Sequence, residues 1–205
     1  MDLNAIRSLG SQPIAGGAPA GESVRYETEF EQLSVEIEKL TAVEQVAVDW
    51  RVVVNLSSTL LKDKGKDLLV ASYLATGLLE RESYSGLAAG IAVVNGLVAN
   101  FWEGLFPESR RLRARVSAID WMSARLEKVL EARGDPSPNE REALEECIEG
   151  LSKILADEAN HFESNAPNIG PARRALKAQL ETIPLPEPEP DPPAEPEATP
   201  EATPA

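Results

Sequence analysis

The chain has 205 residues, enough for one sizeable domain, and 42% of them are hydrophobic, which can build a substantial core. Its net charge of −14 argues against nucleic acid or an anionic membrane as the main partner. Cys147 is the only cysteine, which excludes an intramolecular disulfide and a thiolate metal cluster and suits a reducing compartment. The N-terminus lacks the basic and apolar regions of a signal peptide.

Residues 1–21 are expected to form an extended N-terminal arm laid over the body. Six glycines and prolines between Gly10 and Gly21 leave little room for a regular element. A phosphate-binding loop is an alternative for these glycines, but no Gly-Lys-Ser or Gly-Lys-Thr follows and no apolar strand precedes them. The sequence therefore favours a structural arm over a nucleotide site.

Helical periodicity begins after the arm. The first helix is predicted over residues 27–40, with an apolar stripe of Tyr26, Phe30, Leu33, Ile37 and Leu40. The second starts at an N-cap residue, Asp49, and ends near Gly65. A third, broadly apolar helix is expected from 67 to about 82.

The next helix, over residues 84–106, is predicted to be the centre of the fold. It is apolar on nearly every side, so other helices or lipid must surround it. Gly90, Gly96 and Gly104 each cost roughly 1 kcal/mol in a helix interior, which is tolerable where a neighbouring helix comes very close. We expect this helix to pair antiparallel with the preceding one across a short turn at residues 83–86.

A membrane-anchored tether is an alternative interpretation of residues 83–102, which carry no charge and are long enough to span a bilayer. Two serines and two asparagines interrupt this run, and no basic loop flanks it to set an orientation. The sequence therefore favours a buried helix without direct membrane insertion.

Three further helices complete an expected all-α, compact bundle of about seven helices over residues 22–183. They are predicted over 108–133, from 137 to about Phe162, and over 171–183. Ser137, Pro138 and Glu140 have the spacing of a capping box with proline at the first helical position. No stretch alternates apolar and polar residues as a strand would.

Residues 184–205 form an acidic, proline-rich linker or tail by composition. Nine of these 22 residues are proline, six are acidic and none is basic. Such a segment cannot bury enough apolar surface to order itself, so we expect it to be disordered and extended. Either the sequence is a fragment that stops within a linker, or the tail is itself a tether.

Residues capable of chemistry are few. His161 is the only histidine, and Asp157 and Glu158 lie one helical turn before it, but a metal site needs three or four ligands. A small-ligand or metal-dependent helical enzyme centred on His161 with Asp157 stays as the alternative function. Cys147 lies on an apolar stripe, which predicts a core residue and not a nucleophile. We expect no catalytic residues, no metal and no cofactor.

A basic run is the remaining candidate site. Arg110, Arg111, Arg113 and Arg115 lie near the start of the 108–133 helix. They form either a solvated face balanced by nearby glutamates or a surface that binds an acidic protein partner. From the residues alone, the sequence predicts a soluble helical interaction module.

Seven sequence blocks, in order, resemble the ImpA-type N-terminal domain of TssA-like proteins of the bacterial type VI secretion system. The resemblance covers roughly residues 13–123 and is weaker from 124 to 183. The blocks are residues 13–22, Val24-Arg25-Tyr26 with Glu29-Phe30, residues 48–51, Lys66-Asp67-Leu68 with Ala71, Tyr73, Leu74 and Ala75, residues 86–90, residues 101–107, and residues 113–121.

The resemblance implies a cytoplasmic, non-enzymatic assembly or scaffold protein. Such proteins resemble one another in this domain and contact baseplate, sheath or tube proteins during assembly of the contractile tail, which implies a place at the inner membrane through the baseplate. In the family, oligomerisation is carried by the C-terminal region. This sequence shows only a Pro/Glu segment there, so we expect self-association to need a region that the sequence does not contain.

Overall fold

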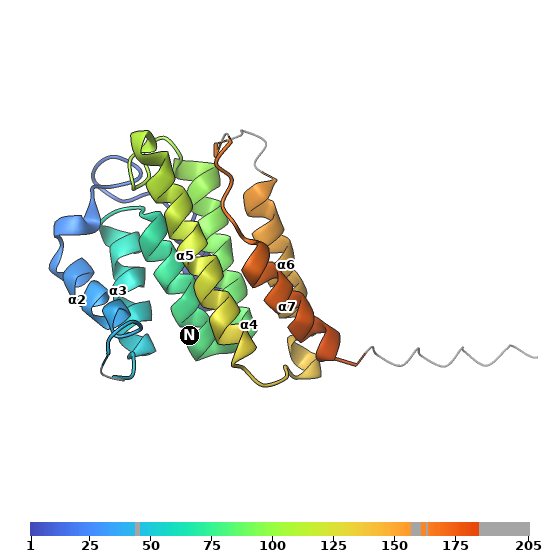
Figure 1. Cartoon of the computed structure of the whole chain (residues 1–205). Coiled ribbons are helices and arrows are strands. Elements are labelled where there is room, and N and C mark those ends of the chain that lie inside the picture. The colour runs from blue at the N-terminus through green and yellow to red at the C-terminus, as the bar shows by residue number, and fades with distance from the viewer. Residues whose placement is uncertain (44–45, 157–160, 163, 185–205) are drawn as a thin grey trace, which may run out of the picture.

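The computed structural model describes residues 1–43, 46–156, 161–162 and 164–184, and this part of the chain is an all-helical bundle (Figure 1). The expected fold class is therefore confirmed. The predicted tail lies outside the described residues from 185 onward. The α-helices are α1 Leu3–Ser8, α2 Thr28–Glu38, α3 Trp50–Asp63, α4 Leu68–Phe101, α5 Leu112–Glu131, α6 Arg141–Leu155 and α7 Gly170–Thr182, with 3-10 turns at Val24–Tyr26, Ser109–Arg111 and Pro138–Glu140.

Helix α4 is the hub of the bundle, and it contains both the helix predicted as the centre, residues 84–106, and the helix predicted before it, residues 67–82. It contacts α1, α3, α5 and α6, while α2 packs on α3, and α7 packs on α5 and α6 (Figure 1). Helical geometry breaks inside α4 at Glu82 and Ser83, where the chain reverses. The backbone amide of Leu68 donates to the carbonyl oxygen of Phe106 at 2.8 Å, so the two ends of this helical hairpin meet. The predicted antiparallel pair is confirmed, with its turn at residues 82–83 and its second arm ending at Phe101.

Two glycines of α4 allow the backbone of another segment to come very close. A Cβ atom added at Gly90 would lie 2.4 Å from the Cα of Ala75 on the opposite arm of the hairpin. A Cβ atom at Gly96 would lie 2.7 Å from the carbonyl oxygen of Gly10. Both distances are far below van der Waals contact, so only glycine fits at these two positions.

The first ten residues differ from the expected irregular arm. Leu3–Ser8 form the short helix α1, which Asp2 caps by accepting from the backbone amides of Asn4 and Ala5. Ile6 and Leu9 are buried in the same core as α4. The prediction was wrong here because the glycines and prolines begin only at residue 10, so nothing in the first nine residues opposes a capped helix.

Local capping signals set several helix starts. Asp49 accepts from the amides of Arg51 and Val52 and begins α3 as predicted. The amide of Ser137 donates to Glu140 Oε2 at 2.8 Å within the predicted capping box, which leads through a 3-10 turn into α6. Helix α6 ends at Leu155, before the predicted end near Phe162. Helix α5 begins at Leu112, because residues 109–111 form a 3-10 turn.

The membrane alternative concerns α4, the one described helix that is long and apolar enough to cross a bilayer. However, 67% of its most apolar window is buried inside the protein. Its two arms also fold back on each other at Ser83. The apolar surface of α4 is therefore covered by helices of the same bundle.

Candidate protein-interaction site

A surface groove of about 720 Å³ lies where four segments of the chain meet. These are the 3-10 turn at Val24–Tyr26, the start of α4, the segment 106–111 and the first half of α5. We call it the Tyr26 groove. Its lining residues are Ser23, Arg25, Tyr26, Asp67, Leu69, Phe106, Pro107, Glu108, Arg110, Arg111, Ala114, Ser117, Ala118 and Trp121.

Backbone hydrogen bonds hold the walls of this groove together. The amide of Lys66 donates to the carbonyl of Ala20 at 2.8 Å, and the amide of Phe106 donates to the carbonyl of Lys66 at 2.7 Å. Gly21 and Gly65 face each other in this crossing, and a Cβ at Gly65 would lie 2.0 Å from the carbonyl oxygen of Glu22. Gly21 and Gly65 therefore serve a tight backbone crossing, whereas a Cβ atom added at Gly16 or Gly17 would meet no described atom within 4 Å.

Arg115 is buried, so its assignment to an exposed basic surface was wrong. Its Nε donates to the carbonyl of Pro107 and its Nη2 to the carbonyl of Leu105, both at 2.6 Å. The guanidinium lies 4.3 Å from the ring centre of Trp102. Arg115 shares the face of α5 that carries Ala118 and Met122, and this spacing could have predicted its burial. The side chain fixes the wall of the groove and does not face a partner.

The other three arginines of the run are exposed. Arg110 pairs with Glu108, also at the surface. Within the described part of the chain, neither Arg111 nor Arg113 forms an ion pair. The expectation of an exposed basic run therefore applies to Arg110, Arg111 and Arg113.

Tyr26 is 95% exposed at the edge of the groove, although the helical spacing placed it in the core stripe of α2. The prediction was wrong because Tyr26 belongs to a 3-10 turn, and α2 begins only at Thr28. Helical periodicity therefore does not apply to it. Exposed tyrosines and arginines are the residue types that contribute most to binding at protein interfaces.

Arg25 and Asp67 form an ion pair inside the groove, with Nη2 and Oδ2 3.3 Å apart. Asp67 is buried, and its Oδ1 caps α4 by accepting from the amides of Leu69 and Val70. Burial raises the pKa of the Asp67 carboxyl above its ordinary value, and the charge of Arg25 and the two amides oppose that rise. Arg25 also lies 4.6 Å from the ring centre of Phe30, so the pair fixes the orientation of the 3-10 turn.

Two substitutions at Asp67 should distinguish its contribution to stability as a helix cap from the contribution of its charge. Asp67→Ala loses the helix cap and should lower the free energy of unfolding by about 1 kcal/mol or more. Asp67→Asn keeps a capping oxygen and removes a buried charge, so at pH 7 it should be at least as stable as the wild type. Chemical denaturation of both variants, followed by circular dichroism, measures the difference.

The difference in stability between the wild type and Asp67→Asn should change with pH in a defined direction. Because the folded-state pKa of Asp67 is raised, the folded state holds this proton more tightly than the unfolded state. The wild type should therefore gain stability relative to Asp67→Asn as the pH falls through the raised pKa toward about 4. A constant difference between pH 7 and pH 4 would contradict this assignment.

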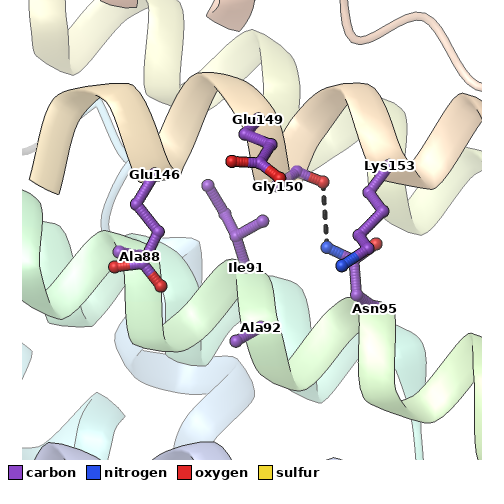
Figure 2. A pocket seen from close by; sticks show the side chains of 8 residues that line it. All are labelled: Ala88, Ile91, Ala92, Asn95, Glu146, Glu149, Gly150 and Lys153. Atoms are coloured by element: carbon purple, nitrogen blue, oxygen red, sulfur yellow. Dashed lines mark hydrogen bonds between the residues drawn. The ribbon is translucent and has the colours of Figure 1, made fainter. Parts of the chain in front are cut away.

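A second hollow, of about 330 Å³, lies between the second arm of α4 and α6 (Figure 2). Ala88, Ile91 and Ala92 form its α4 side, with Glu146 on α6 opposite them. Asn95 crosses the gap and donates to the carbonyl of Gly150 at 2.8 Å. This hydrogen bond joins the two helices, so we interpret the hollow as a helix-packing feature.

His161 and Cys147, the side chains considered for catalysis or metal binding, make packing and hydrogen-bond contacts within the protein. His161 stacks on Trp102 with ring centres 4.5 Å apart, while Asp157 and Glu158, its expected neighbours, lie outside the described residues. No three His, Cys, Asp or Glu side chains gather as a metal site in the described ranges. Cys147 is buried as predicted, and its thiol donates to the carbonyl of Tyr84. Its burial raises the pKa of the thiol, which disfavours the reactive thiolate.

The fold and the groove together define an all-α domain with an aromatic and basic surface groove. The sequence matches the family described as "ImpA, N-terminal, type VI secretion system" over residues 11–124, more than half of the chain, and the protein belongs to this family. Every residue that lines the Tyr26 groove falls within this range. The resemblance seen in the sequence blocks is therefore confirmed.

A solved structure has a similar fold. It is the N-terminal domain, including the conserved ImpA_N region, of the TssA component of the type VI secretion system from Burkholderia cenocepacia. The TM-score is 0.72 at 21% sequence identity, and the match covers 88% of this chain and 92% of that chain. No curated protein matches the sequence.

Proposed function

We propose that this protein is a non-enzymatic assembly component of a type VI secretion system that binds baseplate, sheath or tube proteins through the Tyr26 groove. The observation that carries the proposal is the exposed Tyr26 beside Arg110 and Arg111, within the region that matches the family. The proposal places the protein in the cytoplasm, at the inner membrane through the baseplate.

The groove suits a protein partner better than a small reactive molecule. It is open and lined by aromatic, aliphatic and arginine side chains, and its two carboxylates, Asp67 and Glu108, each pair with an arginine. Pairs of this kind leave no free acid or base for catalysis. Aromatic and guanidinium groups provide large contact areas and directional hydrogen bonds at protein interfaces.

Binding measured with purified proteins tests the proposal. Baseplate, sheath and tube proteins of the same secretion system are each titrated against the full chain, and we expect at least one to bind. Tyr26→Ala combined with Arg111→Glu should weaken that binding by about tenfold or more, which corresponds to loss of one interface hot spot.

A matched control distinguishes the groove from the rest of the surface. Val43 is fully exposed and Lys153 lines the hollow between α4 and α6, so Val43→Ala combined with Lys153→Glu should leave binding unchanged. If none of the three proteins binds, the proposed function is wrong. If one binds and both double variants weaken it equally, the assignment to the Tyr26 groove is wrong.

A further inference from the structure

We propose that the Tyr26 groove is one part of a longer groove between α2 and α5, and that this longer groove binds an amphipathic helix of a partner protein with an acidic C-terminal end. The inference rests on the proposed role of the Tyr26 groove as a binding surface, and it names the kind of partner segment and its direction. It follows from the continuity of two hollows, from their helical walls and from opposite charges at their two ends.

Another hollow adjoins the Tyr26 groove. It has a volume of about 290 Å³ and lies between α2, the first arm of α4 and α5, and we call it the Tyr73 hollow. Arg25, Leu69 and Trp121 line both the Tyr73 hollow and the Tyr26 groove. The two hollows therefore belong to one continuous surface, which we call the α2–α5 groove.

The floor of the α2–α5 groove is apolar surface that the bundle leaves partly uncovered. Helix α2 packs on α3, whereas α5 packs on α4 and α7 (Figure 1). Between α2 and α5, the first arm of α4 presents Leu69 and Tyr73, which are only half-buried. Tyr73 meets Trp121 edge to face, with ring centres 4.7 Å apart. Phe30 and Leu40, on the α2 side, are half-buried as well, so both walls offer contacts for apolar side chains of a partner.

The walls of this groove favour a helical occupant over an extended one. Both walls are mainly α-helices, whose backbone groups are hydrogen-bonded within the helix. An extended segment binds best along the free edge of a sheet, and the described residues form only two isolated β-bridges. A helix satisfies its own backbone and inserts apolar side chains spaced three and four residues apart.

The α2–α5 groove is long enough for about three turns of helix. Its lining extends from Arg111 to Trp121 on the α5 side and from Phe30 to Thr41 on the α2 side. At a rise of about 1.5 Å per residue each wall is about 15 Å long, and three turns of an α-helix are about 16 Å long. Three turns place several apolar residues of an amphipathic helix on one face.

Opposite charges at the two ends set the direction of the bound helix. Arg110 and Arg111 line the end near Tyr26. Arg110 is held only by an exposed pair with Glu108, which has little energetic value. Glu38 lines the other end, is exposed and forms no ion pair within the described part of the chain.

A helix matches these charges in one direction only. Its C-terminal end carries partial negative charge and its N-terminal end partial positive charge, so the C-terminal end faces the two arginines. Carboxylates in the last turn add paired hydrogen bonds with the guanidinium groups. Basic residues in the first turn face Glu38.

Two model peptides, each titrated against the full chain, test this direction. Both are stapled helices about four turns long with leucines on one face. The first has lysines in its first turn and glutamates in its last turn, and the second has the same composition with these two turns exchanged. We expect the first peptide to bind about tenfold more tightly. It should shift the amide NMR signals of residues 30–41 and 110–121 and leave those of Asn95 and Gly150, in the hollow between α4 and α6, unchanged.

Exchanging the charges of the groove should exchange this preference. In the triple variant Arg110→Glu, Arg111→Glu and Glu38→Arg, the second peptide should bind more tightly than the first. Leu69→Glu should weaken both peptides by about tenfold or more, because it places a charge on the apolar floor. A glutamate is compatible with the first turn of α4. Val35→Glu is the matched control, since Val35 is exposed on α2 and lines neither hollow.

Several results would overturn the inference. These are binding of neither peptide, equal affinities for the two peptides in the wild type, and signal changes confined to another surface. An unstapled peptide with a central proline cannot form the helix and should not bind, so tighter binding of that peptide would show an extended occupant. Signal shifts at residues 30–41 and 110–121 that grow with protein concentration, without any peptide, would show a second copy of the chain in the groove.

Binding of secretion proteins separates this inference from the proposed function. A secretion protein that binds should slow deuterium exchange of amides at residues 30–41 as well as at 23–26 and 108–111. If the peptides bind with the expected preference but no secretion protein binds, the proposed function fails alone. If a secretion protein binds at the Tyr26 groove and neither peptide binds, the inference of a helical occupant fails alone.

Discussion

Gly90→Leu is expected to lower the free energy of unfolding by about 3 kcal/mol, because overpacking against backbone atoms cannot be relieved by a rotamer change. Even a Cβ atom at this position would lie 2.4 Å from the Cα and 2.7 Å from the Cβ of Ala75. The two arms of the α4 hairpin would have to separate, and they form the centre of the core. Thermal unfolding should show a melting temperature lower by about 10 °C.

Substitutions at two other glycines test whether steric overlap causes this loss of stability. Gly96→Leu should destabilise the protein in the same way, because its Cβ would approach the backbone of Gly10. Gly134 lies between α5 and α6, and a Cβ atom added there would meet no described atom within 4 Å, so Gly134→Ala should change the melting temperature little. If Gly90→Leu melts at the same temperature as the wild type, α4 is not the tightly packed hub described above.

Arg115→Met is expected to lower the free energy of unfolding by about 3 kcal/mol, because breaking a buried charged contact leaves its partners unsatisfied. The substitution keeps a long apolar side chain but leaves the carbonyls of Leu105 and Pro107 without their donors. It also removes the guanidinium that stacks on Trp102. Urea denaturation measures the loss.

Arg115→Met should also loosen the wall of the Tyr26 groove, although Arg115 itself does not face a partner. Amides of residues 105–111 should exchange with deuterium faster in Arg115→Met, because the side chain no longer holds this segment. Arg113→Met is the matched control, since Arg113 is two residues away and exposed. Equal stability and equal exchange in the two variants would show that Arg115 does not position the groove.

The sequence alone predicted the helical elements because their signals are local. Asp49 and the Ser137–Glu140 box mark helix starts through hydrogen bonds that span only a few residues. The apolar character of residues 84–106 identified the hub, because a helix without a polar face must be surrounded. Gly90 and Gly96 were predicted to mark close contacts, since glycine inside a helix is otherwise costly.

The tertiary structure alone decided which residues form the groove. Arg25 and Asp67 are far apart in sequence and meet only because the 3-10 turn packs on the start of α4. Tyr26 is exposed because it precedes α2, so helical periodicity could not place it. Arg113 and Arg115 are alike in sequence, yet one faces solvent and the other the core. Local signals determine hydrogen bonds within an element, whereas exposure at a groove depends on how distant elements pack together.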